Sequence, residues 1–209
     1  MYAETLSKDT RTVLEKIVPV AAPFYLAGGT ALALQFGHRI SVDLDFFCQN
    51  IFSVTLLVEK LNTIGNLNIE DQSKSTFNGM LDGVKISFFH YPYPLIFKRK
   101  DFMGVFLADE RDIGAMKVQA ISDRGNKKDF VDLFVLLRKY SIEELLGFFN
   151  KKYEKFNYNR LHILKSLSYF YNADENPEPI YIHPIAWTEV KKVIKNKVDE
   201  YIKSDIIWP

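Results

Sequence analysis

The sequence has very little cysteine and no long apolar run. One cysteine in 209 residues, Cys48, excludes an internal disulfide. No apolar stretch approaches the roughly 20 residues of a membrane-spanning helix, and residues 1–8 lack the basic and apolar segments of a signal peptide. These absences exclude a disulfide scaffold and a membrane-spanning protein, and they fit a reducing compartment. We therefore expect a cytoplasmic protein with no membrane partner.

The sequence also has almost no net charge. It carries 27 Lys and Arg against 26 Asp and Glu, a formal charge of +1, so no global field attracts nucleic acid. The distribution is uneven, because residues 1–90 hold 7 basic and 9 acidic residues whereas residues 91–139 hold 10 and 7. A basic middle segment facing an acidic metal site suits a polyanionic substrate, but ordinary solvated surface charge explains the same counts.

The most informative segment of the sequence is 24–47. An apolar run at 24–27 predicts a buried strand, and Gly28 and Gly29 follow it. Residues 30–36 predict a helix that ends at Gly37. Residues 42–47 alternate with period two, which predicts a second strand with Asp43 and Asp45 on one face.

This order of elements predicts a phosphate site beside a metal site. Glycines let backbone N–H groups approach a ligand and a helix N-terminus attracts anions, so Gly28, Gly29 and Thr30 are candidate phosphate ligands. Asp43 and Asp45 repel each other unless a cation lies between them, and a hard cation such as Mg²⁺ suits two carboxylates and phosphate oxygens. A buried turn beside two surface acids is the simpler alternative, but aspartate is depleted in strands and a pair there needs a reason.

These two motifs and their spacing support a family assignment. The Gly-Gly-Thr turn at 28–30, the Gly-His-Arg-Ile-Ser linker at 37–41 and the Asp-Leu-Asp-Phe-Phe strand at 43–47 resemble the nucleotidyltransferase core of the AbiEii/AbiGii toxin family. Residues 117–133 resemble the second half of the family signature, Lys…Arg…(Arg/Lys)-Asp-x-x-Asp-Leu. The resemblance covers about residues 20–140, and the chain beyond Tyr140 carries no specific signal.

The resemblance implies a toxin of a bacterial toxin–antitoxin or abortive-infection system, with a cognate antitoxin as a partner. It implies transfer of a nucleotide from an NTP to an acceptor, and RNA such as tRNA is the acceptor reported for relatives. Asp43 and Asp45 would hold Mg²⁺ as the metal ligands. The turn at 28–30 would hold the triphosphate with help from Lys117, and Asp129 would activate the acceptor hydroxyl or support the metal.

Residues of the second motif also have simpler interpretations. Arg124 either clamps phosphate or pairs with Asp129 or Asp132. Lys117 alone would be read as a surface lysine with a buried stem, and the two aspartates as acids that stabilise the first turn of a helix. Arg39 lies between the two upstream motifs and is long enough to reach phosphate, but an isolated loop arginine is usually structural, so we assign it no role.

The chain departs from the usual superfamily pattern at one strand. Many nucleotidyltransferases carry a third carboxylate on a strand after the Asp-x-Asp strand. The matching segment here, 84–89, offers only Lys85 and Ser87 as polar residues. The number of metal ions therefore stays open, and the resemblance implies that Lys117 and Asp129 replace the missing acid in the same cleft.

The sequence predicts an α+β protein with a nucleotidyltransferase-like mixed sheet, flanking helices and a helical C-terminal region. We expect a core at 1–108 and a helical region at 109–209 that completes the active-site cleft. Apolar periodicity and turn residues predict further elements. They are helices at 6–18 (ending near Pro19), 54–64, from about 110, from about 127, 141–149, 159–170 and 188–202, and extended segments at 67–70, 75–81, 84–91 and 104–108, with a hairpin turn at Asp82-Gly83.

Two other classes of function remain open at this point. Paired aspartates and a lysine also suit a metal-dependent nuclease or phosphohydrolase, although hydrolysis of a polymer does not need a triphosphate cradle. The missing third acid leaves room for a binding module that kept the fold and lost catalysis.

Overall fold

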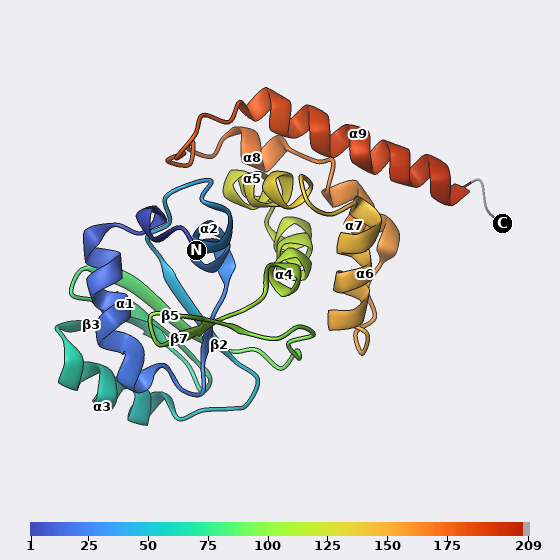
Figure 1. Cartoon of the computed structure of the whole chain (residues 1–209). Coiled ribbons are helices and arrows are strands. Elements are labelled where there is room, and N and C mark those ends of the chain that lie inside the picture. Colours follow the sequence, from blue (N-terminus) through green and yellow to red (C-terminus); the bar gives the residue numbers. More distant parts are fainter. Residues whose placement is uncertain (207–209) are drawn as a thin grey trace. The chain divides into compact units, whose positions relative to one another are not determined.

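The computed structural model of the chain describes residues 1–206 (Figure 1). The chain divides into two compact units, Met1–Asp109 and Glu110–Pro209. Residues 207–209, at the end of the second unit, lie outside the described part. The first unit contains every strand of the described chain and the second is helical. This arrangement confirms the predicted α+β class, with a mixed sheet, flanking helices and a helical C-terminal region.

The first unit is built on a seven-stranded mixed sheet with the order β3-β4-β5-β2-β1-β7-β6. Strand β2 runs parallel to β5 and β1 runs parallel to β7, and the other neighbours are antiparallel. Helices α1 and α3 pack against each other beside the sheet (Figure 1). The elements are η1 (Ala3–Thr5), α1 (Lys8–Ala21), β1 (Tyr25–Leu26), α2 (Gly28–Phe36), β2 (Leu44–Cys48), α3 (Val54–Ile64), β3 (Leu67–Gln72), β4 (Thr76–Leu81), β5 (Val84–His90), β6 (Lys100–Phe102) and β7 (Val105–Leu107).

The register of the central strands separates an aromatic row from a polar row. Phe46 on β2 lies opposite Phe88 on β5, which lies opposite Phe77 on β4, and all three side chains are completely buried. The Phe46 and Phe88 rings stack with their centroids 4.9 Å apart. Because side chains alternate along a strand, the preceding or following residue on each strand belongs to the opposite face. That second row consists of Asp45, Ser87 and Asn78.

Local sequence signals account for most of the boundaries, with a few differences. Asp82 and Gly83 both have positive φ and join β4 to β5 as a two-residue hairpin, as predicted. Helix α1 begins after the N-cap Ser7 and runs through Pro19 to Ala21, so the predicted end near the proline is wrong. Strand β6 was not expected, because its three residues carry no alternating pattern.

The second unit is a set of helices in which α4 contacts α5, α6 and α7, while α9 contacts α5 and α6. A capping box begins α6, since Ser141 and Glu144 bond each other's backbone N–H. The helix predicted at 159–170 is shorter and is followed by the brief α8. The elements are α4 (Glu110–Asp123), α5 (Lys127–Leu136), α6 (Ile142–Lys152), α7 (Arg160–Ser166), α8 (Tyr171–Asp174) and α9 (Trp187–Ile206).

An ion pair inside the second unit joins α4 to α6. Lys152 Nζ lies 2.8 Å from Asp112 Oδ1, and neither side chain is exposed. Burial lowers the pKa of Lys152, and the charge and hydrogen bond of Asp112 oppose that effect. The pair fixes the packing of the two helices, because separating the charges would leave one of them buried alone. Within residues 1–206, no helix has the length and apolar character needed to cross a membrane.

Candidate functional site

The glycine turn lies directly against the aspartate strand. Gly28 opens α2 with a φ of +66°, a conformation that favours glycine. A Cβ atom added to Gly28 would lie 3.0 Å from Asp45 Oδ2, so the carboxylate lies close to the side of Gly28 where a side chain would project. The N–H of Ala27 donates to the carbonyl of Asp45 over 3.0 Å. The predicted phosphate turn and one predicted metal ligand are therefore neighbours in the first unit.

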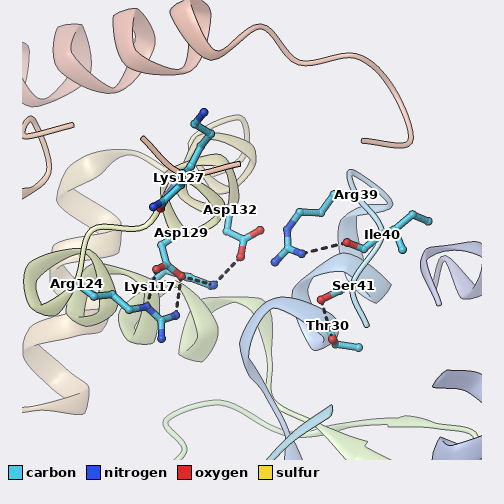
Figure 2. A network of polar contacts seen from close by, with 10 residues as sticks. Thr30, Arg39, Ile40, Ser41, Lys117, Arg124, Lys127, Asp129 and Asp132 are labelled. Carbon is cyan, nitrogen blue, oxygen red and sulfur yellow. Dashed lines mark hydrogen bonds and ion pairs between the residues drawn. The ribbon is translucent and has the colours of Figure 1, made fainter. Parts of the chain in front are cut away.

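A hydroxyl on α2 holds the other aspartate. Strand β2 begins at Leu44, so Asp43 is the last residue before the strand rather than part of it. The Thr30 hydroxyl donates to the carbonyl of Asp43. It also shares a 2.8 Å hydrogen bond with Ser41 Oγ (Figure 2). Thr30 is buried near the start of α2. Its hydrogen bond to the Asp43 carbonyl holds the segment that carries Asp43 in place.

Arg39 occupies a position beside the turn that sequence reasoning did not assign. A Cβ atom on Gly29 would lie only 2.2 Å from Arg39 Nη2, so the guanidinium occupies the space that a side chain at position 29 would fill. Arg39 Nη1 donates to the carbonyl of Ile40 over 3.2 Å (Figure 2). Arg39 lies beside Gly29 because the linker 37–41 folds back on α2. No local sequence pattern predicts a contact of this kind.

At the position where many nucleotidyltransferases carry a third carboxylate, this chain has Ser87 on β5. Ser87 is the direct neighbour of Asp45 across β2 and β5, and Asn78 follows it on β4. Among residues 1–206, no three His, Cys, Asp or Glu side chains form a group that could hold a metal ion. The donor set near the turn is thus the pair Asp43 and Asp45. Such a pair fits Mg²⁺, which is commonly bound by one or two carboxylates together with substrate phosphates and waters.

In the second unit, a buried lysine lies between two aspartates. Lys117 on α4 places its Nζ atom 2.9 Å from Asp129 Oδ1 and 2.6 Å from Asp132 Oδ2, both on α5 (Figure 2). The aspartates are three residues apart and therefore share one face of the helix. The Lys117 side chain is 5% exposed and both carboxylates are fully buried. The alternative of a solvent-edge lysine is therefore wrong.

Arg124 completes this cluster from the turn between the two helices. Its Nε donates to Asp129 Oδ2 over 2.9 Å and its Nη2 donates to Asp129 Oδ1 over 3.1 Å, a bidentate pair (Figure 2). Of the two roles considered from the sequence, pairing with Asp129 is the one observed. Burial acts to raise the pKa of Asp129, but the charges and hydrogen bonds of Lys117 and Arg124 outweigh it and lower that pKa. We call Lys117, Arg124, Asp129 and Asp132 the lysine cluster.

The structure thus forms two groups of predicted site residues, each inside its own unit. The turn at 28–30 and Asp45 meet in the first unit, with Asp43 tied to Thr30. The lysine cluster forms in the second unit. Joint action of the two groups in one reaction stays a prediction, and so does each residue's role in it.

Comparisons with known proteins agree with the fold. An uncharacterized protein of Aquifex aeolicus (strain VF5) is 42% identical over 212 residues, covering 95% of this chain and 98% of its own length. A nucleotidyltransferase candidate of H. pylori with a crystal structure has a TM-score of 0.62 at 18% identity, covering 95% of this chain and 96% of its own. MenT4, a nucleotidyltransferase toxin from Mycobacterium tuberculosis H37Rv, has a TM-score of 0.58 at 13% identity, with 90% and 81% covered.

The family comparison concerns the unit that carries the glycine turn and the aspartate pair. Residues 12–101 match the family model described as "Nucleotidyl transferase AbiEii toxin, Type IV TA system". This range contains most of α1, the turn at 28–30, β2 and β5, so it covers the first group of site residues and the position of the absent third acid. The resemblance found in the sequence is confirmed, and the chain belongs to the AbiEii nucleotidyltransferase toxin family.

Proposed function

We propose that this protein transfers a nucleotide from an NTP to an acceptor hydroxyl in a reaction that depends on Mg²⁺. The observation that supports it most directly is the contact between Gly28 and the Asp45 carboxylate. An NTP bound with its phosphates on the turn would lie next to the carboxylates that suit the metal. A hydrolase acting on a polymer has no use for that combination.

The reaction itself forms one bond and breaks one. The acceptor oxygen bonds to the α-phosphorus, and the bond between that phosphorus and the oxygen bridging to the β-phosphate breaks. Pyrophosphate leaves with the bridging oxygen, and the proton of the acceptor hydroxyl passes to solvent water. Mg²⁺ held by Asp43 and Asp45 would neutralise phosphate charge and orient the triphosphate. The backbone N–H groups at Gly28, Gly29 and Thr30 would bind phosphate oxygens at the positive end of α2.

The lysine cluster has a supporting part in this proposal. Lys117 would offset negative charge on the triphosphate as a point charge. Asp129 was expected to serve as a general base or a metal ligand, but both of its oxygens accept hydrogen bonds and its pKa is lowered, which makes it a weak base. We propose that Asp129 and Asp132 mainly hold Lys117 in position, and that Arg124 orients Asp129.

The acceptor, the partner and the location are finer parts of the same proposal. We take RNA such as tRNA as the acceptor and a cognate antitoxin as the protein partner, because the chain belongs to a family of type IV toxin–antitoxin systems. Since an NTP and RNA are the proposed reactants, the expected location is the cytoplasm. The resemblance to MenT4 is at low identity and supports the fold only.

An assay with labelled substrates tests the proposal. The purified protein is incubated with an α-phosphate-labelled NTP, total RNA and Mg²⁺, and the RNA is examined for label and for length. We expect label on RNA of unchanged or slightly greater length, which requires Mg²⁺ and is lost in Asp43→Asn and Asp45→Asn. The fold of both variants should survive, because removing one of two neighbouring carboxylates relieves repulsion.

Three other outcomes of this assay would contradict the proposal, each in a different way. Shortened RNA without label would support the nuclease alternative. Mg²⁺-dependent NTP binding without turnover, on any acceptor supplied, would support a binding module. Full transfer activity in both aspartate variants would remove Asp43 and Asp45 from the site.

A further inference from the structure

We infer that one surface of the second unit binds single-stranded RNA, the acceptor of the proposed reaction. This surface consists of Tyr169, Tyr171 and Lys165 beside an apolar groove between α7 and α9, and we call it the tyrosine platform. The inference rests on the proposed function and names a binding surface for its acceptor. It starts from two exposed aromatic rings that stack on each other.

Tyr169 and Tyr171 present their rings to solvent side by side. The two residues are 60% and 64% exposed, and their ring centroids lie 6.3 Å apart with an angle of 28° between the ring planes. Single exposed aromatic residues are ordinary on a protein surface, but two stacked rings form an extended flat surface. Such a surface suits the flat face of a nucleobase, because bases of any sequence stack on aromatic side chains.

The residue between the two tyrosines anchors them to the second unit. The ring centroid of Phe170 lies 4.8 Å from that of Phe130 on α5 and 5.8 Å from that of Trp187 on α9. Phe130 is completely buried, so this contact ties residues 169–171 to the core of the unit. The tyrosines are thus attached to an anchored segment, and less conformational freedom is lost when a base stacks on them.

An apolar groove borders Tyr169. It has a volume of about 550 Å³, and its lining includes Leu161 and Leu164 of α7 together with Val198 and Ile202 of α9. This volume lies within the range of about 300–1,000 Å³ that is usual for small-molecule sites. The groove therefore offers apolar contact to a second base, next along the strand from the one that stacks on the tyrosines.

The charge around the tyrosine platform favours a polyanion. Residues 151–171 hold five Lys and Arg and one acidic residue, in a chain that is nearly neutral overall. Lys165 lines the groove and is exposed, and among residues 1–206 it forms no ion pair. Asp199 is the acidic residue of the lining, and Lys195 and Lys203 lie four residues before and after it on the same side of α9. Stacked rings beside exposed lysines suit bases linked by phosphates, whereas a helix of a protein partner would need only the apolar groove.

Fluorescence anisotropy with a labelled single-stranded RNA of mixed sequence tests the inference, and the matching RNA duplex is titrated in parallel. For the double variant Tyr169→Ala/Tyr171→Ala we expect at least a tenfold loss of affinity for the single strand, because the stacking surface is removed. The affinity for the duplex, whose bases already stack on each other, should change less than twofold. Tyr169→Phe/Tyr171→Phe keeps both rings and should bind like the wild type. Ile180→Ala, which removes a 69% exposed side chain without a ring, is the matched control and should also bind like the wild type.

Lys165→Gln tests the electrostatic part of the inference. A lysine that neutralises one phosphate of a single strand contributes about 0.7 to the slope of log affinity against log salt concentration. We therefore expect this variant to bind the single strand more weakly, with a slope that is smaller by about that amount. Lys8→Gln, at an exposed lysine on α1, is the control and should keep the wild-type slope.

The outcomes separate this inference from the proposed function. Transfer of label to RNA by the wild type, together with unchanged single-strand affinity in the double alanine variant, overturns the inference and leaves the proposed function standing. Equal losses for the single strand and the duplex overturn it as well, because stacking would not be the cause. A wild-type dimer that the double alanine variant cannot form, with RNA affinity unchanged, overturns it in favour of a second copy of the chain.

Two further results are decisive. If the double alanine variant does not fold, Tyr171→Ala alone and Lys165→Gln carry the test, and normal RNA affinity in both overturns the inference. A wild-type protein that binds no RNA and transfers no label to it overturns the RNA acceptor of the proposed function along with the inference. Calorimetric titration with the NTP should give wild-type affinity in every variant of the tyrosine platform.

Discussion

Lys117 Nζ lies 2.9 Å from Asp129 Oδ1, and both side chains are almost completely buried. Asp132 supplies a second carboxylate at 2.6 Å from the same nitrogen. A lysine in this position contributes to the packing of α4 against α5, and it is also a candidate for binding the triphosphate of the NTP. The expected effects of mutation change accordingly, because a surface lysine contributes little to stability and a buried one that neutralises two acids contributes much.

Replacement of Lys117 by methionine should therefore affect stability as well as activity. The change keeps most of the volume and leaves Asp129 and Asp132 buried without their cation, which costs about 3–5 kcal/mol of unfolding free energy. Denaturant unfolding measures the loss, and the labelling assay measures transfer. Lys85→Met, at an exposed lysine paired with the exposed Glu70, is the control and should cost about 1 kcal/mol or less. Equal unfolding curves for the two variants would contradict the structural role.

The lowered pKa of Asp129 predicts a particular dependence of stability on pH. A carboxyl group whose folded pKa lies below its ordinary value of 3.8 stabilises the fold above that value, and the contribution is lost as pH falls through the folded pKa. Asp129→Asn should thus be less stable than the wild type at neutral pH, and the difference should shrink below about pH 4. Urea unfolding at a series of pH values tests this. A constant difference from pH 7 to pH 2 would show that ionisation of Asp129 is not the cause.

The Thr30 hydroxyl should matter more than the sequence suggested. The sequence assigned Thr30 only to the phosphate turn, but its buried hydroxyl bonds both the Asp43 carbonyl and Ser41 Oγ. Thr30→Val keeps the shape and leaves those partners unsatisfied, at a cost of about 1–3 kcal/mol. It should also weaken Mg²⁺ binding in the presence of NTP, because the segment carrying Asp43 loses its support. Thr30→Ser keeps the hydroxyl and should restore both properties, and failure to do so would point to the methyl group instead.

Ser87→Asp should create the third carboxylate that this chain lacks. Ser87 is the direct neighbour of Asp45 across β2 and β5, so the new carboxylate would face the same side of the sheet. We expect tighter Mn²⁺ or Mg²⁺ binding and, without metal, a lower melting temperature from repulsion among the acids. Asn62→Asp on α3 adds the same charge at an exposed position and should change neither. Unchanged metal affinity in Ser87→Asp would place the metal away from Asp45.

The sequence by itself determined the features that depend on neighbouring residues. The apolar run, the glycines and the helix-forming stretch at 24–36 specify strand, turn and α2, because each signal acts within a few residues. The hairpin at Asp82-Gly83 and the capping box at Ser141 are local for the same reason. The motif spacing was sufficient to identify the family.

Only the tertiary structure decided which distant groups meet. Ser87 stands beside Asp45 because two strands separated by many residues pair in one register, and a shift of one residue would have placed it on the other face. Arg39 rests on Gly29 because a loop folds back on α2. Lys117 is buried because α4 packs on α5, whereas its spacing in the sequence is equally compatible with a surface position. Burial and charge pairing are properties of the packed chain, and they set how each of these residues behaves.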